Sequence, residues 1–453
     1  MPVEFASKVL TDGVASVQYL PQILRLLPWA ALVYALRWFF GGQSNKVDRV
    51  MHGKVVMVTG GTSGLGAAIV DDLASKGAQI ILLVRSTHDS WLVDYISDLR
   101  ARYRNTLIYA EECDLSSLHS IRVFCTTWLD NSPPRRLDSI VLAAGIMAPP
   151  FSARTLTKDG VEAHWGIDYL ANYHFLTLML PALKVQPPDR DVRVLVATCP
   201  AYMMGELDLN DPEFLQRGYP ARRPWLVYGA AKIALMSLVA ELQRQLDGYK
   251  RPDGMPMNVK IYSVDPGIMR SPGSRRWLSL GSVVGLFVYL VMWPVWWIVL
   301  KSTGEGAQSF LAGLYDPDFS RGQGGGLIRE CRISPFRKPE IDSDVLGEQL
   351  YEISKLQVEQ VEKEAALARA RQKKQQSQQN DSDATKTAAK GGDSETGGAD
   401  GATDNSAPKQ KKGDSEGKKV AFTDDVDVDD KTETSATETP KSASKRRPRK
   451  KKA

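Results

Sequence analysis

Six short apolar runs, separated by longer stretches with helical periodicity, constrain the fold of this chain more than any other feature. The runs are rich in Val, Ile and Leu and begin at Lys54, Gln79, Thr106, Ser139, Val192 and Val259. Strands that alternate with helices form a parallel sheet, and strands buried on both faces read as continuous apolar runs. The sequence therefore predicts an α/β fold built on a parallel sheet.

The composition excludes several classes of protein. The 58 basic side chains barely exceed the 53 acidic ones, and the excess lies in the tail after Val361, so a nucleic-acid-binding body is not indicated. The four cysteines are far apart and lack metal-ligand spacing, which argues against a disulfide framework or a zinc site: Cys113, Cys125, Cys199 and Cys331. A reducing compartment and no metal are expected.

The first apolar run leads directly into a glycine-rich turn. Thr59 to Gly66 reads TGGTSGLG and is followed by the helical pattern AAIVDDLASKG. Glycines at 60, 64 and 66 allow a tight turn, the approach of a pyrophosphate and a helix N-terminus beneath it. A glycine pattern alone is weak, but its position between a strand and a helix predicts a dinucleotide site.

The ends of the next strands carry further candidate residues. Arg85 follows the second run, 19 positions after Gly66, where sites that prefer NAD usually carry an acid. An arginine there favours the 2′-phosphate of NADP(H), although a surface role for Arg85 is the alternative. Asp114 and the Ala143-Ala144-Gly145 turn follow the third and fourth runs, at the sheet edge where ligands bind.

A tyrosine and a lysine lie four residues apart at the start of a later helical pattern. Tyr228 and Lys232, in YGAAK, should share one face of that helix. The ammonium group would then lower the pKa of the phenol from about 10. Such a tyrosine can donate a proton to a carbonyl oxygen or remove one from an alcohol.

The order of TGGTSGLG, Asp114-Leu115, AAG, YGAAK and DPGIMRS resembles the short-chain dehydrogenase/reductase family, in its retinol-dehydrogenase-like branch. The resemblance covers roughly residues 50–360 and is nearest to fungal members that associate with membranes and lipid droplets. It implies a Rossmann-type, doubly wound sheet in a single domain. It also implies NADP(H), reversible oxidation of lipophilic alcohols, and a homodimer through the helix bearing Tyr228 and Lys232.

The resemblance also assigns the candidate cofactor-binding residues and identifies two departures from the family pattern. The cofactor set is Gly60, Thr62, Ser63, Gly64, Leu65, Gly66, Arg85, Asp114, Leu115, Ala144, Gly145, Tyr228, Lys232, Pro266, Gly267 and Ile268. Cys199 stands where the family has a serine that binds the substrate oxygen, beside Thr198. Asp168 stands in place of an asparagine that holds a proton-relay water. A thiol is a weak donor, so oxyanion support would fall unless Thr198 replaces it.

Two hydrophobic segments predict contact with a membrane. Residues 17–40 contain Arg25, Arg37 and two prolines, and their uncharged stretch of 11 residues is too short to span a bilayer. An interfacial or re-entrant anchor is favoured over a helix packed on the body. The first 16 residues lack the basic region and cleavage site of a secretory leader.

The second segment, residues 280–300, has no charge, but Pro294 divides it. A shallow hairpin or bent helix is therefore favoured over a plain span, with a buried lid helix as the alternative. Because the matching family segment lines the substrate pocket, an apolar lid here suggests that substrate enters from lipid.

The C-terminal part changes character twice. A long amphipathic helix is predicted after Asp342, and from Gln372 onward the composition predicts disorder. The terminal basic block at 445–452 suits anionic lipid, nucleic acid, a nuclear address or a simple solvated tail. The resulting boundaries are an anchor at 1–49, the catalytic domain at 50–360, and a helical extension with a charged tail at 361–453.

The leading hypothesis is an NADP(H)-dependent oxidoreductase acting on a lipophilic alcohol and its aldehyde or ketone. The expected location is a lipid droplet or the cytosolic face of the endoplasmic reticulum, with a vacuolar membrane as a further candidate. The alternative is a lipid-surface scaffold or regulator that binds dinucleotide with little turnover, which the changes at Cys199 and Asp168 favour. Nucleic-acid binding through the tail is the weakest hypothesis because the basic block lacks interleaved aromatic residues.

Overall fold

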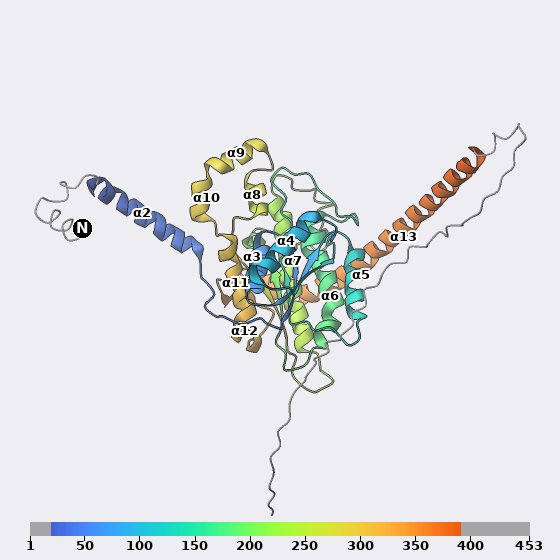
Figure 1. Ribbon diagram of the computed structural model, residues 1–453, viewed down its shortest axis with the longest axis horizontal. Coiled ribbons are helices and arrows are strands. Elements are labelled where there is room, and N and C mark those ends of the chain that lie inside the picture. The colour runs from blue at the N-terminus through green and yellow to red at the C-terminus, as the bar shows by residue number, and fades with distance from the viewer. Residues whose placement is uncertain (1–19, 391–453) are drawn as a thin grey trace, which may run out of the picture. The chain divides into compact units, whose positions relative to one another are not determined.

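The computed structural model describes residues 20–390 and contains one mixed sheet of eight strands in the order β3-β2-β1-β4-β5-β6-β7-β8 (Figure 1). The strands are β1 Val55–Thr59, β2 Gln79–Val84, β3 Ile108–Glu112, β4 Ser139–Leu142, β5 Val192–Ala197, β6 Val259–Asp265, β7 Leu327–Arg329 and β8 Arg332–Ser334. All pairs are parallel except β7 with β8. The predicted α/β fold is confirmed.

The helices alternate with the strands as the periodicity predicted. In chain order they are α2 Leu20–Gly41, α3 Gly64–Ser75, α4 Ser90–Tyr103, α5 Leu118–Leu129, the π-helix η2 His164–Leu170, α6 Ala171–Lys184, the 3₁₀ turn η3 Pro200–Met203, α7 Pro224–Asp247, α8 Pro272–Leu278, α9 Val283–Val291, α10 Trp293–Val299, α11 Thr303–Tyr315, α12 Asp318–Arg321, the 3₁₀ turn η4 Pro339–Asp342 and α13 Asp344–Lys390.

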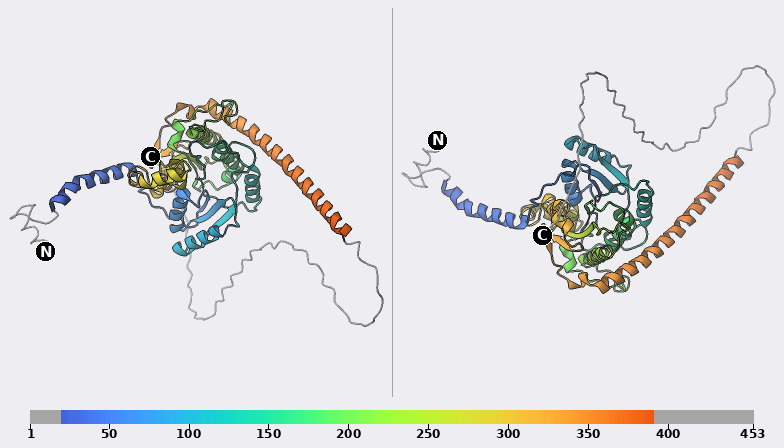
Figure 2. Two further views of the ribbon diagram at one scale, coloured as in Figure 1. Left: turned by 90° about the horizontal axis from the view of Figure 1, so that it is seen from above. Right: turned by 90° about the horizontal axis from the view of Figure 1, so that it is seen from below.

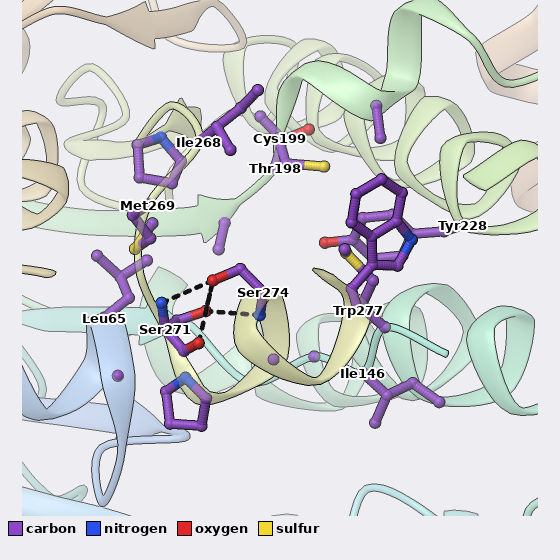
Figure 3. Close-up of a pocket in the computed structure, with 18 of the residues that line it drawn as sticks. Leu65, Ile146, Thr198, Cys199, Tyr228, Ile268, Met269, Ser271, Ser274 and Trp277 are labelled. Carbon is purple, nitrogen blue, oxygen red and sulfur yellow. Dashed lines mark hydrogen bonds between the residues drawn. The ribbon is translucent and has the colours of Figure 1, made fainter. Parts of the chain in front are cut away.

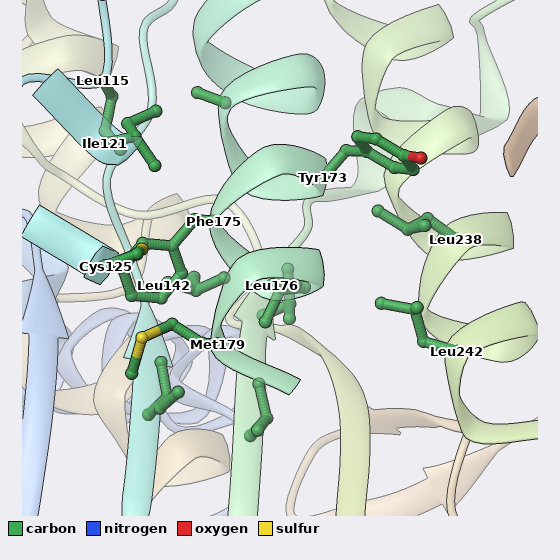
Figure 4. Close-up of a cluster of buried hydrophobic side chains, with 14 of the residues drawn as sticks. Leu115, Ile121, Cys125, Leu142, Tyr173, Phe175, Leu176, Met179, Leu238 and Leu242 are labelled. Carbon is green, nitrogen blue, oxygen red and sulfur yellow. The ribbon is translucent and has the colours of Figure 1, made fainter. Parts of the chain in front are cut away.

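Two layers of helices enclose the sheet. Side chains that alternate along each strand pack on one face against α3, α4 and α11, and on the other against α5, α6 and α7. In the second layer Phe175, Leu176 and Met179 of α6 belong to one buried cluster with Cys125 of α5 and with Leu238 and Leu242 of α7, and Figure 4 shows Phe175 beside Cys125, on the side of α6 away from α7. This double cover explains why the central strands carry apolar residues at every position.

One apolar helix lies in the core and not on the surface. Among the described residues, α7 alone has the length and composition of a membrane-crossing helix, yet 78% of its apolar stretch is buried in the protein. The first part of α13 covers part of its outer side, where Arg244 of α7 forms a salt bridge with Asp344. The helix predicted to form a dimer interface is therefore already partly covered by its own chain.

The two hydrophobic segments adopt short or exposed helices. Residues 280–300 form α9 and α10, which break at Met292, just before Pro294, so the bent arrangement is observed and the continuous span is not. The described part of the N-terminal segment is α2, which packs against α10 (Figure 2). We call residues 272–299, which comprise α8 to α10, the lid.

Several expectations differ from the structure or lie beyond it. The short strands β7 and β8 were not predicted, because three-residue runs carry almost no periodic signal. The helix α13 continues to Lys390, beyond Gln372 where the composition predicted that order ends. The expectations for the first 16 residues and the terminal basic block concern residues outside the described range.

Arg193 joins the sheet to α11 at a fully buried position. Its guanidinium donates to both Asp191 carboxylate oxygens, at 2.8 and 2.6 Å, and to the Gly313 and Asp316 carbonyl oxygens, each at 2.7 Å. Only 1% of its surface is exposed. Each of these acceptors would lose a donor if the side chain were removed, and buried acceptors without donors are costly.

We therefore expect Arg193→Met to lower the free energy of unfolding by roughly 3 kcal/mol, as is typical when one partner of a buried ion pair is removed. Urea denaturation followed by circular dichroism measures this change. Arg321→Met, at an exposed position on α12, is the matched control and should change stability by less than about 0.5 kcal/mol. Equal stability of the two variants would contradict the prediction.

Candidate active site

A cavity of about 360 Å³ opens at the carboxyl ends of β1, β4, β5 and β6, beside α8 of the lid (Figure 3). Twelve of the predicted site residues line it: Ser63, Gly64, Leu65, Ala144, Gly145, Thr198, Cys199, Tyr228, Lys232, Pro266, Gly267 and Ile268. Motifs separated by up to 200 residues thus meet in one place, because parallel strands share one carboxyl edge.

The glycine turn after β1 has the backbone geometry of a phosphate-binding loop. A Cβ atom on Gly66 would lie 2.2 Å from the Gly60 carbonyl oxygen, and one on Gly60 would lie 2.8 Å from the Ala144 Cα atom. No side chain caps the first turn of α3, which begins at Gly64. The amide groups of that turn and the helix dipole therefore fit a bound phosphate.

Six predicted cofactor residues are not among those that line the cavity: Gly60, Thr62 and Gly66 belong to the glycine turn, and Arg85, Asp114 and Leu115 lie toward the β2 and β3 edge. Arg85 is exposed at the end of β2. Asp114 accepts hydrogen bonds from the Ser116 amide and hydroxyl groups and forms a salt bridge with Lys158 at 2.7 Å. Leu115 packs in the core with 9% of its surface exposed, and Thr62 is half-buried in the glycine turn.

Tyr228 and Lys232 share one face of α7, as their spacing predicted. The Lys232 Nζ atom lies 5.3 Å from the Tyr228 ring centroid, 3.3 Å from the Ala197 carbonyl oxygen and 3.6 Å from Asp168 Oδ1. Burial raises the pKa of Tyr228 well above 10, and the neighbouring Cys199 and Asp168 add to the shift. The expected lowering is therefore wrong for this structure, because desolvation of the buried phenol is the largest influence on its pKa and acts in the opposite direction.

Thr198 and Cys199, the two residues after β5, have different neighbours. Thr198 directs its hydroxyl group to the Met236 sulfur at 3.1 Å, so it does not replace the missing serine in this geometry. Cys199 lines the cavity together with Tyr228, and burial raises the pKa of its thiol to about 11. Cys199 is therefore protonated at neutral pH and can donate a weak hydrogen bond at the reacting end of the cavity.

Asp168 is placed by the π-helix η2, a rare element that often occurs at functional sites. Its Oδ1 atom accepts from the Ile146 amide at 3.0 Å and faces Lys232, while its Oδ2 atom has no hydrogen-bond partner among the described residues. Burial raises the pKa of Asp168, although the charge of Lys232 opposes this shift. The carboxylate thus lies beside Lys232 but does not itself line the cavity.

Sequence reasoning missed a buried pair next to the tyrosine. The His164 and Tyr228 rings meet edge to face, with centroids 6.0 Å apart. The Nε2 atom of His164 accepts from the Ala148 amide at 3.1 Å, so its Nδ1 atom carries the proton and donates to Glu162 at 2.9 Å. The spacing of four residues between His164 and Asp168 was a signal that could have identified this histidine.

The turn at Pro266 to Ile268 lines the cavity and precedes the lid in the chain. Asp265 Oδ1 accepts from the Gly267 amide at 2.9 Å, which holds the turn. The Arg270 amide donates to the Lys301 carbonyl at 2.8 Å, and Lys301 donates back to Ile268 at 3.1 Å. The two ends of the lid are therefore fastened to each other at the cavity.

Comparisons with known proteins agree with this geometry. The sequence profile of the short chain dehydrogenase family matches residues 54–197. The Schizosaccharomyces pombe protein named uncharacterized oxidoreductase pbr1 is 43% identical over 332 residues, which cover 73% of this chain and 88% of that protein. The Saccharomyces cerevisiae protein named uncharacterized oxidoreductase YNL181W is 36% identical, over 82% of this chain and 95% of its own length.

A human relative indicates the branch of the family. Retinol dehydrogenase 14 of Homo sapiens is 28% identical over 353 residues, which cover 72% of this chain and 94% of that protein. The family fold binds a nicotinamide dinucleotide, and the glycine turn described above fits such a group. The chain therefore belongs to the short-chain dehydrogenase/reductase family of oxidoreductases, in its retinol-dehydrogenase-like branch.

Proposed function

We propose that this protein is an NADP(H)-dependent oxidoreductase that interconverts a lipophilic alcohol and its aldehyde or ketone at a membrane or lipid-droplet surface. The observation that carries the proposal is the convergence of Tyr228, Lys232 and Cys199 in an apolar cavity at the end of the glycine turn. A second reading, a dinucleotide-binding scaffold, rests on the weak thiol donor of Cys199 and is an outcome of the test below.

The lining of the cavity supports a lipophilic substrate. Beyond the polar groups near Tyr228, its walls consist mainly of apolar side chains: Ile146, Met147, Met204, Trp225, Ile268, Met269, Trp277, Leu278 and Leu300. Apolar walls with a few convergent polar groups bind a hydrocarbon body and orient one polar end. The polar end would be the carbonyl or hydroxyl oxygen, which must reach Tyr228.

Three residues would carry out and support proton transfer during the reaction. A bound NADPH would supply the hydride for carbonyl reduction, held by the glycine turn and by the Pro266 to Ile268 turn. The Tyr228 phenol would give its proton to the carbonyl oxygen, and the Cys199 thiol would orient that oxygen. Lys232, held by Asp168 and the Ala197 carbonyl, keeps a positive charge beside the phenolate that forms. Because its raised pKa keeps Tyr228 protonated at neutral pH, the phenol is in the form that can donate a proton to a carbonyl oxygen.

The preference for NADP(H) is supported by Arg85. The side chain is exposed where β2 ends, next to the glycine turn after β1, and β1 and β2 are paired in register from Val55 to Thr59. Its guanidinium can pair with a 2′-phosphate, which NAD(H) lacks. Lys158 lies near Arg85 at the same edge, where its ammonium group is paired with Asp114 at 2.7 Å.

The membrane surface is proposed from exposed apolar side chains on α2 and the lid. On α9, Val283 and Phe287 are 85% and 68% exposed, and on α2 Trp38 is 76% exposed. Contiguous exposed apolar surface of this kind marks an interaction site, and tryptophan suits a lipid interface. Arg37 of α2 forms a salt bridge with Glu305 and lies over the Trp297 ring at 5.6 Å, which joins α2 to the lid.

We expect Tyr228→Phe to lower the kcat for NADPH-dependent reduction of long-chain aldehydes and ketones at least about 100-fold, because general acid catalysis contributes that much. NADPH binding, measured by fluorescence titration, should persist. Because the phenol pKa is raised, wild-type reduction should stay level from neutral to mildly alkaline pH. Tyr249→Phe, at a partly exposed position, is the control.

Cys199→Ser separates the enzyme from the scaffold reading. A serine hydroxyl is a stronger donor than a thiol, so the variant should keep or raise kcat in an active enzyme. The test fails for the enzyme if the wild type, this variant and Tyr228→Phe all bind NADPH but none reduces the long-chain aldehydes and ketones. The proposed activity is then refuted for those substrates, and the scaffold hypothesis is favoured.

For Arg85→Asp we expect the KM for NADPH to rise at least about tenfold, with little loss or a gain for NADH, because the new carboxylate repels a 2′-phosphate and accepts from ribose hydroxyls. Steady-state kinetics with each cofactor measure the ratio. Arg321→Asp makes the same charge change away from the cavity and should leave the ratio unchanged. An unaltered ratio in Arg85→Asp would show that the Arg85 side chain does not contribute to the choice between NADPH and NADH.

The double variant Val284→Asp/Phe287→Asp should reduce co-flotation with phospholipid vesicles several-fold, because it places two charges on the exposed apolar face of α9. Activity toward a short, water-soluble aldehyde should be retained. Val345→Asp, at an exposed apolar position on α13, is the control. Vesicle binding equal to that of the wild type would show that α9 does not contribute to membrane binding.

A further inference from the structure

The π-helix η2 presents two pairs of side chains in different directions. His164 and Asp168, four residues apart, face Tyr228 and Lys232. Trp165 and Tyr169, each one residue later, face α13, and their rings pack against each other at a tilt of 42° with centroids 4.4 Å apart. All four side chains are at most 1% exposed. The rotation of η2 about its own axis that points His164 and Asp168 toward α7 therefore also points Trp165 and Tyr169 toward α13.

The helix α13 makes two polar contacts to the outer pair. The Ser354 hydroxyl group is hydrogen-bonded to the Tyr169 hydroxyl group at 2.5 Å, and Ser354 is completely buried. The Trp165 indole donates to the Gln357 side-chain oxygen at 3.0 Å. Between and beside these contacts, Leu350 and Val358 of α13 belong to the same buried core as Trp165 and Tyr169.

The Gln357 side chain also reaches the start of η2 from a second direction. Its amide nitrogen donates to Glu213 Oε1 at 3.0 Å. The other oxygen of Glu213 accepts from the backbone amide of Glu162 at 2.9 Å and from Arg154 at 3.0 Å. Glu162 in turn accepts from His164 and from the Trp165 amide at 2.8 Å. Gln357 thus connects η2 to the loop that carries Glu213, and Glu213 holds the backbone just before η2.

We propose that Ser354 and Gln357 are positioning residues, which hold η2 in the register that places His164 beside Tyr228 and Asp168 beside Lys232. The proposal rests on the proposed function for the role of Tyr228, but its structural part concerns η2 alone. These two residues lie on α13 and are not among the residues that line the cavity.

A π-helix needs such support from outside itself. Its hydrogen bonds join residues i and i+5, one residue farther apart than in an α-helix, and it is rare and occurs mostly as single turns within α-helices. Loss of the outer contacts would let η2 relax toward the α-helical spacing of α6, which follows it directly. The rotation this requires would turn Asp168 away from Lys232 and the Ile146 amide.

Gln357→Met tests the proposal, because methionine preserves the length of the side chain and removes both hydrogen bonds. Ser354→Ala removes the other contact with little change in volume. Lys355→Ala, at an exposed α13 position between them, is the matched control. The first readout is hydrogen–deuterium exchange of the full chain, followed by mass spectrometry on peptides covering residues 162–172.

We expect amide exchange in that segment to accelerate at least about tenfold in Gln357→Met and in the Ser354→Ala/Gln357→Met double variant, while β1, β4 and β5 keep their protection. Lys355→Ala should match the wild type. Unchanged exchange in residues 162–172 would overturn the proposal. Uniform acceleration across the sheet would also overturn it, because it would show a general loss of stability and no local role.

The second readout is steady-state kinetics. A displaced Asp168 should lower kcat about tenfold, with the KM for NADPH unchanged, since small errors in catalytic geometry cost rate more than binding. Full kcat in the variants despite accelerated exchange would refute the positioning role. If the wild type reduces no substrate, the proposed function fails, and the exchange measurements still decide whether α13 holds η2.

Discussion

The architecture depends on one close approach, between the backbone of the turn after β1 and the first turn of α3. Only a missing side chain at Gly66 permits it, because a Cβ atom there would lie 2.2 Å from a carbonyl oxygen. The strand order places β1 between β2 and β4, where the connections diverge to opposite sides of the sheet. The helix N-terminus is thereby held at the crevice where ligands of such sheets bind.

The other side of this crevice is organised by charge in a region with almost no water. Asp168, His164 and Glu162 are fully buried, and Lys232 is 3% exposed. Such groups are costly to bury unless they are paired, and here each one has a partner, except for one oxygen of Asp168. A chain that only needed a stable core would fill this volume with apolar side chains. The cluster is therefore a feature that core stability alone does not explain.

The features that could be predicted from the sequence are those marked by periodic apolar residues or by a fixed spacing between motif residues. All six apolar runs became strands, and the turn residues that follow them met at one edge because that outcome requires only parallel strands. The Tyr228 and Lys232 spacing also placed both side chains correctly. The patterns could not give the direction of the Tyr228 pKa shift, since burial depends on groups distant in sequence. For the same reason the rotamer of Thr198, the Glu162 and His164 pair and the contacts of α13 were not predictable.

The fastened ends of the lid have a consequence for how this enzyme family can diversify. The backbone at Met269 pairs with that at Lys301, so the segment between them begins and ends at neighbouring points. Changing the length of a loop whose ends already meet costs little entropy, because the cost grows only with the logarithm of the length. This segment can therefore be lengthened, shortened or exchanged without moving the sheet. The cavity lining that α8 supplies and the exposed apolar face of α9 can therefore change without altering α7, which carries Tyr228 and Lys232.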